Sequence, residues 1–334
     1  MPSGQALIDL LAPTITPTSS NLPSFAVKHA AMRLILEKET KAISVAARKA
    51  GPVSPHHRLD VGKMTLGSTS IATVVMLGTD GIPSYPQSTL YSMPNGGSVV
   101  LSPKTADGMI LIAIGGMGSI GSDGGNATVR GGSDSLCIAL GGRGGKGEVG
   151  QIFMPGTPMA QPLPGGQGGV GGQARAESGP GSDVYSYAGA GGKGGTGSPG
   201  TALTYIMNTA AVTPNPSNSR VFPPSDGGQA GLGGNGGSAF CVGGDAAYTM
   251  ATGGNGGSPG EPGPGGKGGK IPFQPGPAKY GDGSEGIGAK GGAGGDTHSL
   301  VGKNGKSNEQ PGKGGKPDKK SGLGASAGPD GTTL

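Results

Sequence analysis

The sequence predicts a bundle of left-handed polyglycine-II helices, a sandwich of such helices preceded by an α-helix and a small antiparallel β unit. Three observations support this fold class. Of the 334 residues, 76 are Gly and 29 are Pro. Hydrophobic residues make up only 32% of the chain and aromatic residues 4%, with no Trp, so the side chains for a large conventional core are missing. From Gly115 onward, glycine recurs at every third position in many short runs.

Residues 1–57 are predicted to form an N-terminal arm followed by a basic amphipathic helix that serves for attachment. The arm, residues 1–23, is rich in Pro, Thr and Ser. Residues 24–51 are typical of a helix, because Ser24 can cap its start and Gly51-Pro52 ends it. Its apolar residues fall near one face: Met32, Ile35, Leu36, Ile43 and Ala46. The basic side could contact nucleic acid or an anionic surface, but a solvated face with the apolar stripe docked on a partner is favoured.

Residues 58–114 carry the strand character of the chain and are predicted to form a small antiparallel β domain. Residues 70–77 are apolar and β-branched, and Asn95-Gly96-Gly97 is a hairpin signal. Residues 109–114 form an apolar strand that runs directly into Gly115. This domain is expected to serve as the base for the glycine-rich part.

Residues 115–334 are predicted to form the polyglycine-II bundle with recognition loops. Three residues per turn is the period of a polyproline-II-type helix, and glycine at every third position leaves one face free of side chains. Backbones can then approach closely enough for hydrogen bonds between helices. A collagen-like triple helix and a disordered linker are weaker alternatives, because every run stops after at most six triplets and gives way to aromatic-bearing segments. The glycines singled out as structural are Gly118, Gly144, Gly194, Gly234 and Gly257.

No pattern in the sequence indicates catalysis, a cofactor or a metal site. Cys137 and Cys241 are the only cysteines, and they form neither a disulfide framework nor a zinc motif. None of the four histidines has a metal-ligand spacing. The nucleophile-elbow match at residues 256–260 and the phosphate-loop-like stretch at 302–307 lack the strand and helix context that those motifs require. An enzyme is therefore not expected.

The segments between glycine runs are predicted to gather at the two ends of the bundle and to present aromatic side chains. Exposed aromatic residues on a rigid frame are typical of recognition surfaces. The alternative is that these aromatics fold back and cap the ends of the bundle. The residues predicted to bind a receptor are Phe153, Tyr185, Tyr187, Tyr205, Phe222, Phe240, Tyr248 and Phe273.

An apolar strand followed by many short glycine runs, with longer aromatic segments between them, resembles the tail-fibre tip adhesins of T-even-type bacteriophages. The resemblance covers about residues 115–325. It rests on residues 109–125, 141–150, 165–172, 189–200, 231–237 and 253–269. It implies a sandwich of polyglycine-II helices whose distal loops bind an outer-membrane protein or another receptor on the bacterial surface.

These expectations combine into a non-enzymatic phage receptor-binding protein located in the virion. Its expected partners are a bacterial outer-membrane protein or surface glycan and, through the N-terminal region, another virion or tail-fibre protein. The N-terminus has no signal-peptide pattern, and no stretch approaches the roughly 20 apolar residues of a membrane span. Synthesis in the host cytoplasm is expected, without membrane insertion or a nucleic-acid partner. The alternatives are a purely structural virion protein (a spike or capsid-associated component) and, as the weakest, an ice-binding protein.

Overall fold

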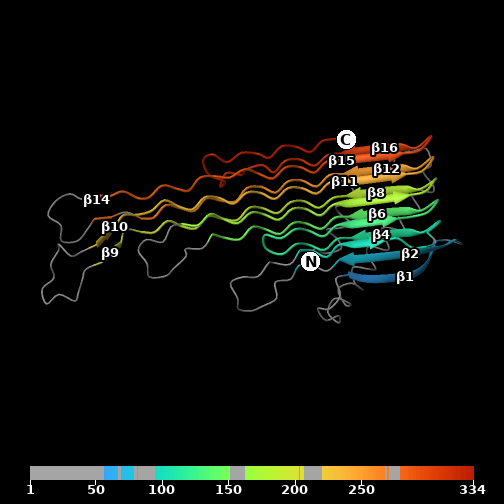
Figure 1. Cartoon of the computed structure of the whole chain (residues 1–334), viewed down its shortest axis with the longest axis horizontal. Helices are drawn as coiled ribbons and strands as arrows, with labels where there is room; N and C mark the ends of the chain where they lie inside the picture. The colour runs from blue at the N-terminus through green and yellow to red at the C-terminus, as the bar shows by residue number, and fades with distance from the viewer. Residues whose placement is uncertain are drawn as a thin grey trace.

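Two β-sheets stand at one end of an elongated molecule, and glycine-rich runs extend from them toward the other end (Figure 1). The computed structural model describes residues 56–66, 69–78, 81, 95–104, 106–150, 162–202, 204–206, 220–267, 269–270 and 279–334. Within these ranges all regular elements are β-strands.

The two large sheets face each other and are called sheet A and sheet B below. Sheet A has seven strands in the order β1 (His56–Leu66), β2 (Thr69–Gly78), β4 (Ile110–Ile114), β6 (Leu136–Leu140), β8 (Asp183–Tyr187), β12 (Tyr248–Thr252) and β16 (Lys306–Gln310). Sheet B has five strands in the order β15 (Thr297–Val301), β11 (Ala239–Gly243), β7 (Ala174–Ser178), β5 (Ala127–Arg130) and β3 (Val99–Leu101). Two small antiparallel pairs lie toward the far end: β9 (Thr204–Ile206) with β10 (Arg220–Phe222), and β13 (Gly269–Lys270) with β14 (Lys279–Tyr280).

From β3 onward, each short turn at the sheet end carries the chain from sheet B to sheet A. Strands β5 and β6, for example, follow each other in sequence but belong to different sheets. Strand β5 pairs in parallel with β7, and β6 pairs in parallel with β4 and β8. A residue with positive φ lies two positions before each sheet A strand from β4 onward: Gly108, Asp134, Gly181, Ala246 and Asn304. The turns also stack, because the Asp134 N–H donates to the Pro180 oxygen at 2.9 Å and the Gly181 N–H to the Asp245 oxygen at 2.9 Å.

The apolar core lies between the two sheets. Leu111, Val129 and Val184 are fully buried there, and most of their neighbours are small. Alternate residues of each strand point into this layer, as the two-residue period of a strand requires. The small members are Ala106, Ala113, Ala127, Ala139, Ala174, Ala176, Ala239, Ala251, Cys137 and Cys241. The core is therefore thin, and it uses the few apolar residues that the chain has.

Both cysteines are expected to resist modification in the folded protein. Cys137 and Cys241 have no exposed surface. Burial raises the pKa of Cys137 to about 11, and it also raises the pKa of Cys241. Because the thiolate is the reactive form, a disulfide reagent at pH 8 should label neither thiol in native protein and both in denaturant. Titration of free thiols before and after unfolding checks this, and rapid labelling of the native protein would contradict the buried positions.

The glycine runs continue the two sheets as two hydrogen-bonded layers. In the run after β6, the Gly144 N–H donates to the Ala190 oxygen at 3.0 Å within its layer, and the Gly145 N–H to the Ser122 oxygen at 2.8 Å in the other layer. The third residue, Lys146, is exposed. Two of every three positions thus face neighbouring backbone, where a side chain does not fit, and the third faces water. This explains the Gly-Gly-X pattern of the run.

Asp and Asn side chains satisfy backbone donors on the outer surface of the layers. Asp123 Oδ1 accepts a hydrogen bond from the Val170 N–H at 2.7 Å, and Asn235 Oδ1 accepts one from the Ala293 N–H at 2.9 Å. Asn255 Oδ1 accepts one from Lys313 in the same way, at 2.9 Å. An extended run has no internal hydrogen bonds, so these donors need partners on a neighbouring run or in water.

The predicted fold class is wrong. The regular structure of the described residues is two mostly parallel β-sheets without a helix, and the glycine runs are extensions of these sheets. The predicted helix at residues 24–51 lies outside the described residues. The predicted antiparallel unit is not separate either, because β2 pairs antiparallel with β1 but parallel with β4, inside sheet A. The physical reason is that the apolar segments between glycine runs bury their side chains against one another, across long stretches of sequence.

The glycines singled out from the sequence all lie against neighbouring backbone. A Cβ atom at Gly118 would overlap the Ser122 oxygen, and one at Gly144 or Gly234 would overlap the Gly169 oxygen. At Gly194 it would overlap the Gly231 oxygen, and at Gly257 the Gly192 oxygen.

Candidate functional site

The outer face of sheet B carries a row of solvent-facing side chains that crosses all five strands. The row consists of Val100, Thr128, Arg175, Phe240 and His298, which stand beside one another in the parallel register. For the first four members of the row, the residues on either side in the strand belong to the core, and Thr297, which precedes His298, is buried, so the row points away from sheet A. Parallel sheets are usually covered on both faces, yet Val100 is 60% exposed. This face is called the sheet B platform below.

Three neighbouring members of the row form one stack of planar groups. The Arg175 guanidinium carbon lies 4.6 Å from the centre of the Phe240 ring. The Phe240 and His298 rings are 5.0 Å apart and inclined by 21°. The His298 Nδ1 donates a hydrogen bond to the backbone oxygen of Leu334 at 2.8 Å, which orients the imidazole ring. The result is a flat strip of cationic and aromatic groups.

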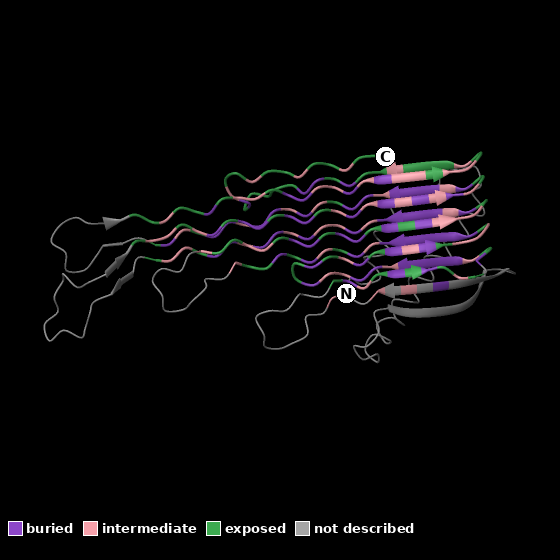
Figure 2. Cartoon of the chain, in the orientation of Figure 1, coloured by how far each residue is buried: buried purple, intermediate pink, exposed green. Residues whose placement is uncertain are grey.

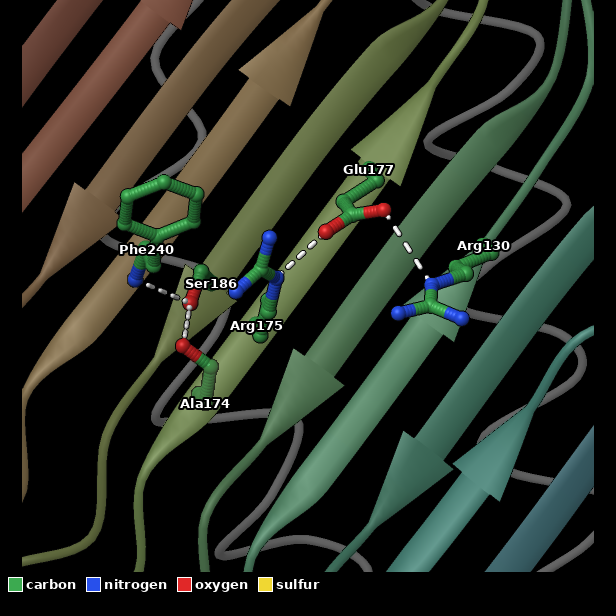
Figure 3. A network of polar contacts seen from close by, with 6 residues as sticks. All are labelled: Arg130, Ala174, Arg175, Glu177, Ser186 and Phe240. Carbon is green, nitrogen blue, oxygen red and sulfur yellow. Dashed lines mark hydrogen bonds and ion pairs between the residues drawn. The ribbon is translucent and has the colours of Figure 1, made fainter.

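A shared carboxylate holds the two arginines of the platform (Figure 3). Glu177 accepts the Arg130 Nε–H at 3.2 Å with one carboxylate oxygen, and its other oxygen accepts the Arg175 Nε–H. The arginine side chains are 55% and 50% exposed and that of Glu177 25% exposed. Such exposed ion pairs contribute little to stability, so their main effect is to orient the guanidinium groups. The cluster keeps one net positive charge, because two arginines share one carboxylate.

A buried serine fixes the backbone beneath the platform. Ser186 of sheet A lies across the core, where its hydroxyl donates to the Ala174 oxygen at 2.7 Å and accepts the Phe240 N–H at 3.2 Å (Figure 3). Strands β7 and β11 are therefore tied together directly below Arg175 and Phe240.

The platform has the chemistry of a binding surface. Arginine forks recognise carboxylate and phosphate groups through paired hydrogen bonds, and a flat aromatic ring adds apolar contact area. In the part of the chain that the structure describes, no three His, Cys, Asp or Glu residues are grouped so that they could hold a metal ion. The described ranges also contain no helix long and apolar enough to cross a membrane.

The structure separates the aromatic residues that the sequence analysis grouped as one recognition set. Phe240 lies on the sheet B platform, whereas Tyr185 and Tyr187 lie on the outer face of sheet A and are buried, as Figure 2 shows for strand β8. Tyr248 is half-buried beside them, with its ring 5.9 Å from that of Tyr185. Burial raises the pKa of Tyr185. These tyrosines belong to strands and not to loops.

The other predicted recognition residues lie near or beyond the limits of the description. Tyr205 belongs to β9 and Phe222 to β10, which pair with each other far from the sheets. Phe153 and Phe273 lie outside the described residues. A receptor-binding role for these four residues stays a prediction.

Sequence reasoning missed Arg130, Arg175, Glu177 and His298 as members of a surface. The signal was present in residues 174–177, where small apolar and charged residues alternate with the period of a strand. The pattern is weak because the segment is short and flanked by glycine runs. These residues meet because β5, β7, β11 and β15 pair in parallel. No local sequence pattern shows this pairing.

Comparison with known proteins gives no family. No protein-family model matches the chain, and no curated protein matches it. Among solved structures it is similar to a springtail antifreeze protein from Granisotoma rainieri, described as a bundle of nine polyproline type II helices. The two chains are 20% identical, the match covers 72% of this chain and 94% of the other, and the TM-score is 0.17. At this TM-score the likeness supports no inference about function.

Proposed function

We propose that the protein is a phage receptor-binding protein that attaches to a bacterial outer-membrane protein or surface glycan without enzymatic activity. The observation that carries the proposal is the sheet B platform, an uncovered parallel sheet with Arg175, Phe240 and His298 stacked on a rigid frame. Arginine and aromatic residues are frequent among the residues that dominate binding energies. A pre-ordered surface also loses little entropy on binding.

The arrangement of the long connections supports the same proposal. The strand pairs β9–β10 and β13–β14 lie at the end opposite the short turns, and residues 207–219 and 271–278 separate their strands in the sequence. Long connections on a rigid frame are where binding residues commonly occur. Location in the virion, and attachment to another tail-fibre protein through the N-terminal region, rest on the resemblance of the glycine runs to tail-fibre tip adhesins.

The proposal is tested by binding of the labelled full-length protein to a panel of Gram-negative cells. Phe240→Ala and Arg175→Ala should each weaken binding to the recognised strain about 10- to 100-fold, because hot-spot truncations cost roughly 1.4–2.8 kcal/mol. Periodate treatment of the cells removes a glycan receptor, and protease treatment removes a protein receptor. Binding is measured as fluorescence per cell over a range of protein concentrations.

Two exposed residues away from the platform provide matched controls. Leu323 is 90% exposed, and Lys313 is exposed on a glycine run, so Leu323→Ala and Lys313→Ala should bind like the wild type. Wild-type-like binding by the Phe240 and Arg175 variants would contradict the platform as the contact surface. Failure to bind any strain, together with tight binding to another virion protein, would favour the purely structural alternative.

A further inference from the structure

A second row of outward-facing side chains runs beside the sheet B platform, two residues further along the same strands. It consists of Arg130, Glu177, Val242 and Leu300, which are aligned by the parallel register. Leu300 is 50% exposed and Val242 is half-buried, so the row ends in apolar side chains on β11 and β15. With the platform, this row divides the face into a cationic half on β5 and β7 and an apolar half on β11 and β15.

The cationic half holds guanidinium donors that the described part of the chain does not use. Arg130 and Arg175 each donate the Nε–H to Glu177 (Figure 3), and no described residue accepts a hydrogen bond from their Nη groups. Glu177 is the one carboxylate in the two rows. Two oriented guanidinium groups that share a single carboxylate keep a net positive charge and paired donors, and this arrangement suits carboxylate or phosphate oxygens.

Polar side chains border the platform on its other side, where the glycine runs enter sheet B. Asn126 and Gln173 are exposed and Ser238 is half-buried, each directly before its strand. Asn126 Oδ1 accepts the Gln173 N–H at 2.8 Å, which fixes the Asn126 amide. At the β15 end of this border, Asp296 Oδ1 accepts the N–H and the hydroxyl of Thr332 at 2.8 and 2.9 Å. The border therefore offers amide and hydroxyl groups, and β11 separates its carboxylate from the arginines.

The size of this face favours a narrow ligand. The five strands of sheet B span about 20 Å, and the border, the platform and the second row together span about 15 Å along the strands. The resulting area of about 300 Å² is well below the roughly 800 Å² that each partner buries in a standard protein–protein interface. A single polymer chain that crosses the strands fits this area better than a folded protein does.

We propose that this face binds an acidic glycan, a sugar chain that carries carboxylate or phosphate groups. The anionic oxygens bind the Nη groups of Arg130 and Arg175, and the C–H groups of the sugar rings pack on the apolar half beside Phe240. Sugar hydroxyls bond to Asn126 and Gln173 at the border. The inference rests on the proposed function, because it names the class of receptor that the same surface recognises.

The test measures binding of the full-length protein to three purified polymers by biolayer interferometry at about 0.15 M salt, where long-range charge attraction is screened. Polygalacturonate carries a carboxylate on each sugar, its methyl ester has the same sugar backbone without the charge, and poly(glycerol phosphate) carries phosphate. We expect binding to polygalacturonate, to poly(glycerol phosphate) or to both, and none to the methyl ester. Equal binding to the ester and the acid, or binding to neither acidic polymer, would overturn the inference.

Arginine variants separate recognition by the fork from general attraction between charges. Arg130→Gln and Arg175→Gln should each weaken binding to the acidic polymer about tenfold or more, the effect of losing a charge-assisted hydrogen bond. Arg175→Lys should also weaken it, because lysine keeps the charge but lacks the planar fork. Arg143→Gln is the matched control, since Arg143 is exposed on the glycine run after β6 and should bind like the wild type. Equal losses in the Arg143 and Arg175 variants would overturn the proposed site.

Competition on cells distinguishes this inference from the proposed function on which it rests. The acidic polymer that binds should displace the labelled protein from the recognised strain, and the methyl ester should not. If Phe240→Ala lowers cell binding but the acidic polymer does not compete, the receptor-binding role stands and the acidic glycan is wrong. If the protein binds the acidic polymer through Arg130 and Arg175 but attaches to no cells, the glycan site stands and the receptor-binding role is wrong.

Discussion

Replacing Gly234 by alanine should destabilise the protein by about 3 kcal/mol or more, at the upper end of what overpacking costs. A Cβ at this position would overlap the Gly169 oxygen and lie 2.6 Å from the Gly168 oxygen. The Gly234 N–H also donates to the Gly192 oxygen at 2.8 Å, so the run is held on two sides. Because the clash is between backbones, no side chain can rotate to relieve it. Denaturant unfolding followed by circular dichroism measures the loss.

Gly281 is the matched control for this substitution. It lies in another glycine run, but nothing stands within 4 Å of a Cβ built on it. Gly281→Ala should change stability by less than about 0.5 kcal/mol or raise it slightly, since alanine restricts the unfolded chain. Equal stability of the Gly234 and Gly281 variants would contradict the close backbone packing of the two layers.

Leu111→Ala should cost about 2–5 kcal/mol, the range for a large side chain removed from a core. Leu111 is fully buried between the sheets and is one of the few large residues in a layer made mainly of alanine, valine and cysteine. Small neighbours on short strands are poorly placed to fill the cavity. The loss should therefore lie in the upper part of that range, and thermal and denaturant unfolding should both show it.

Leu323→Ala serves as the control, because Leu323 is 90% exposed. Its replacement should change the free energy of unfolding by less than about 0.5 kcal/mol. If Leu111→Ala were equally mild, the sheets would not be held together by the side chains between them. The hydrogen bonds of the glycine layers would then have to provide most of the stability.

The two outer faces of the sheets divide the molecule into a structural side and an exposed side. On sheet A, Ile112 and Ile138 are each only 1% exposed. On sheet B, Arg175 and Val100 are exposed, and Phe240 beside Arg175 is half-buried.

Glycine positions were the most predictable part of this protein. The in-phase glycines, such as Gly194 and Gly257, do lie where a side chain would overlap neighbouring backbone. The strands were far less predictable. Residues 183–187 and 239–243 were interpreted as aromatic loops, because each is short, interrupted by small or polar residues and bounded by glycine. Only their pairing with equivalent segments makes them strands of a sheet.

The candidate site depended even more on tertiary structure. Phe240 was singled out for its aromatic ring, but its neighbours Arg175 and His298 come from strands that are far away in the sequence. Tyr185 looked equivalent to Phe240 in sequence and is buried on the other sheet. Whether an aromatic side chain faces solvent or packs against other side chains thus depends on the sheet to which its strand belongs.

By itself, the sequence determined where side chains are absent, and therefore where backbones can approach, because the presence of a Cβ is a property of each residue alone. It also determined that no large conventional core could form. The tertiary structure decided that the apolar segments join as two parallel sheets, which face is covered and which residues form the platform. Parallel pairing brings together segments separated by long connections, and the free energy that selects it comes from burial between those segments and not from any local pattern.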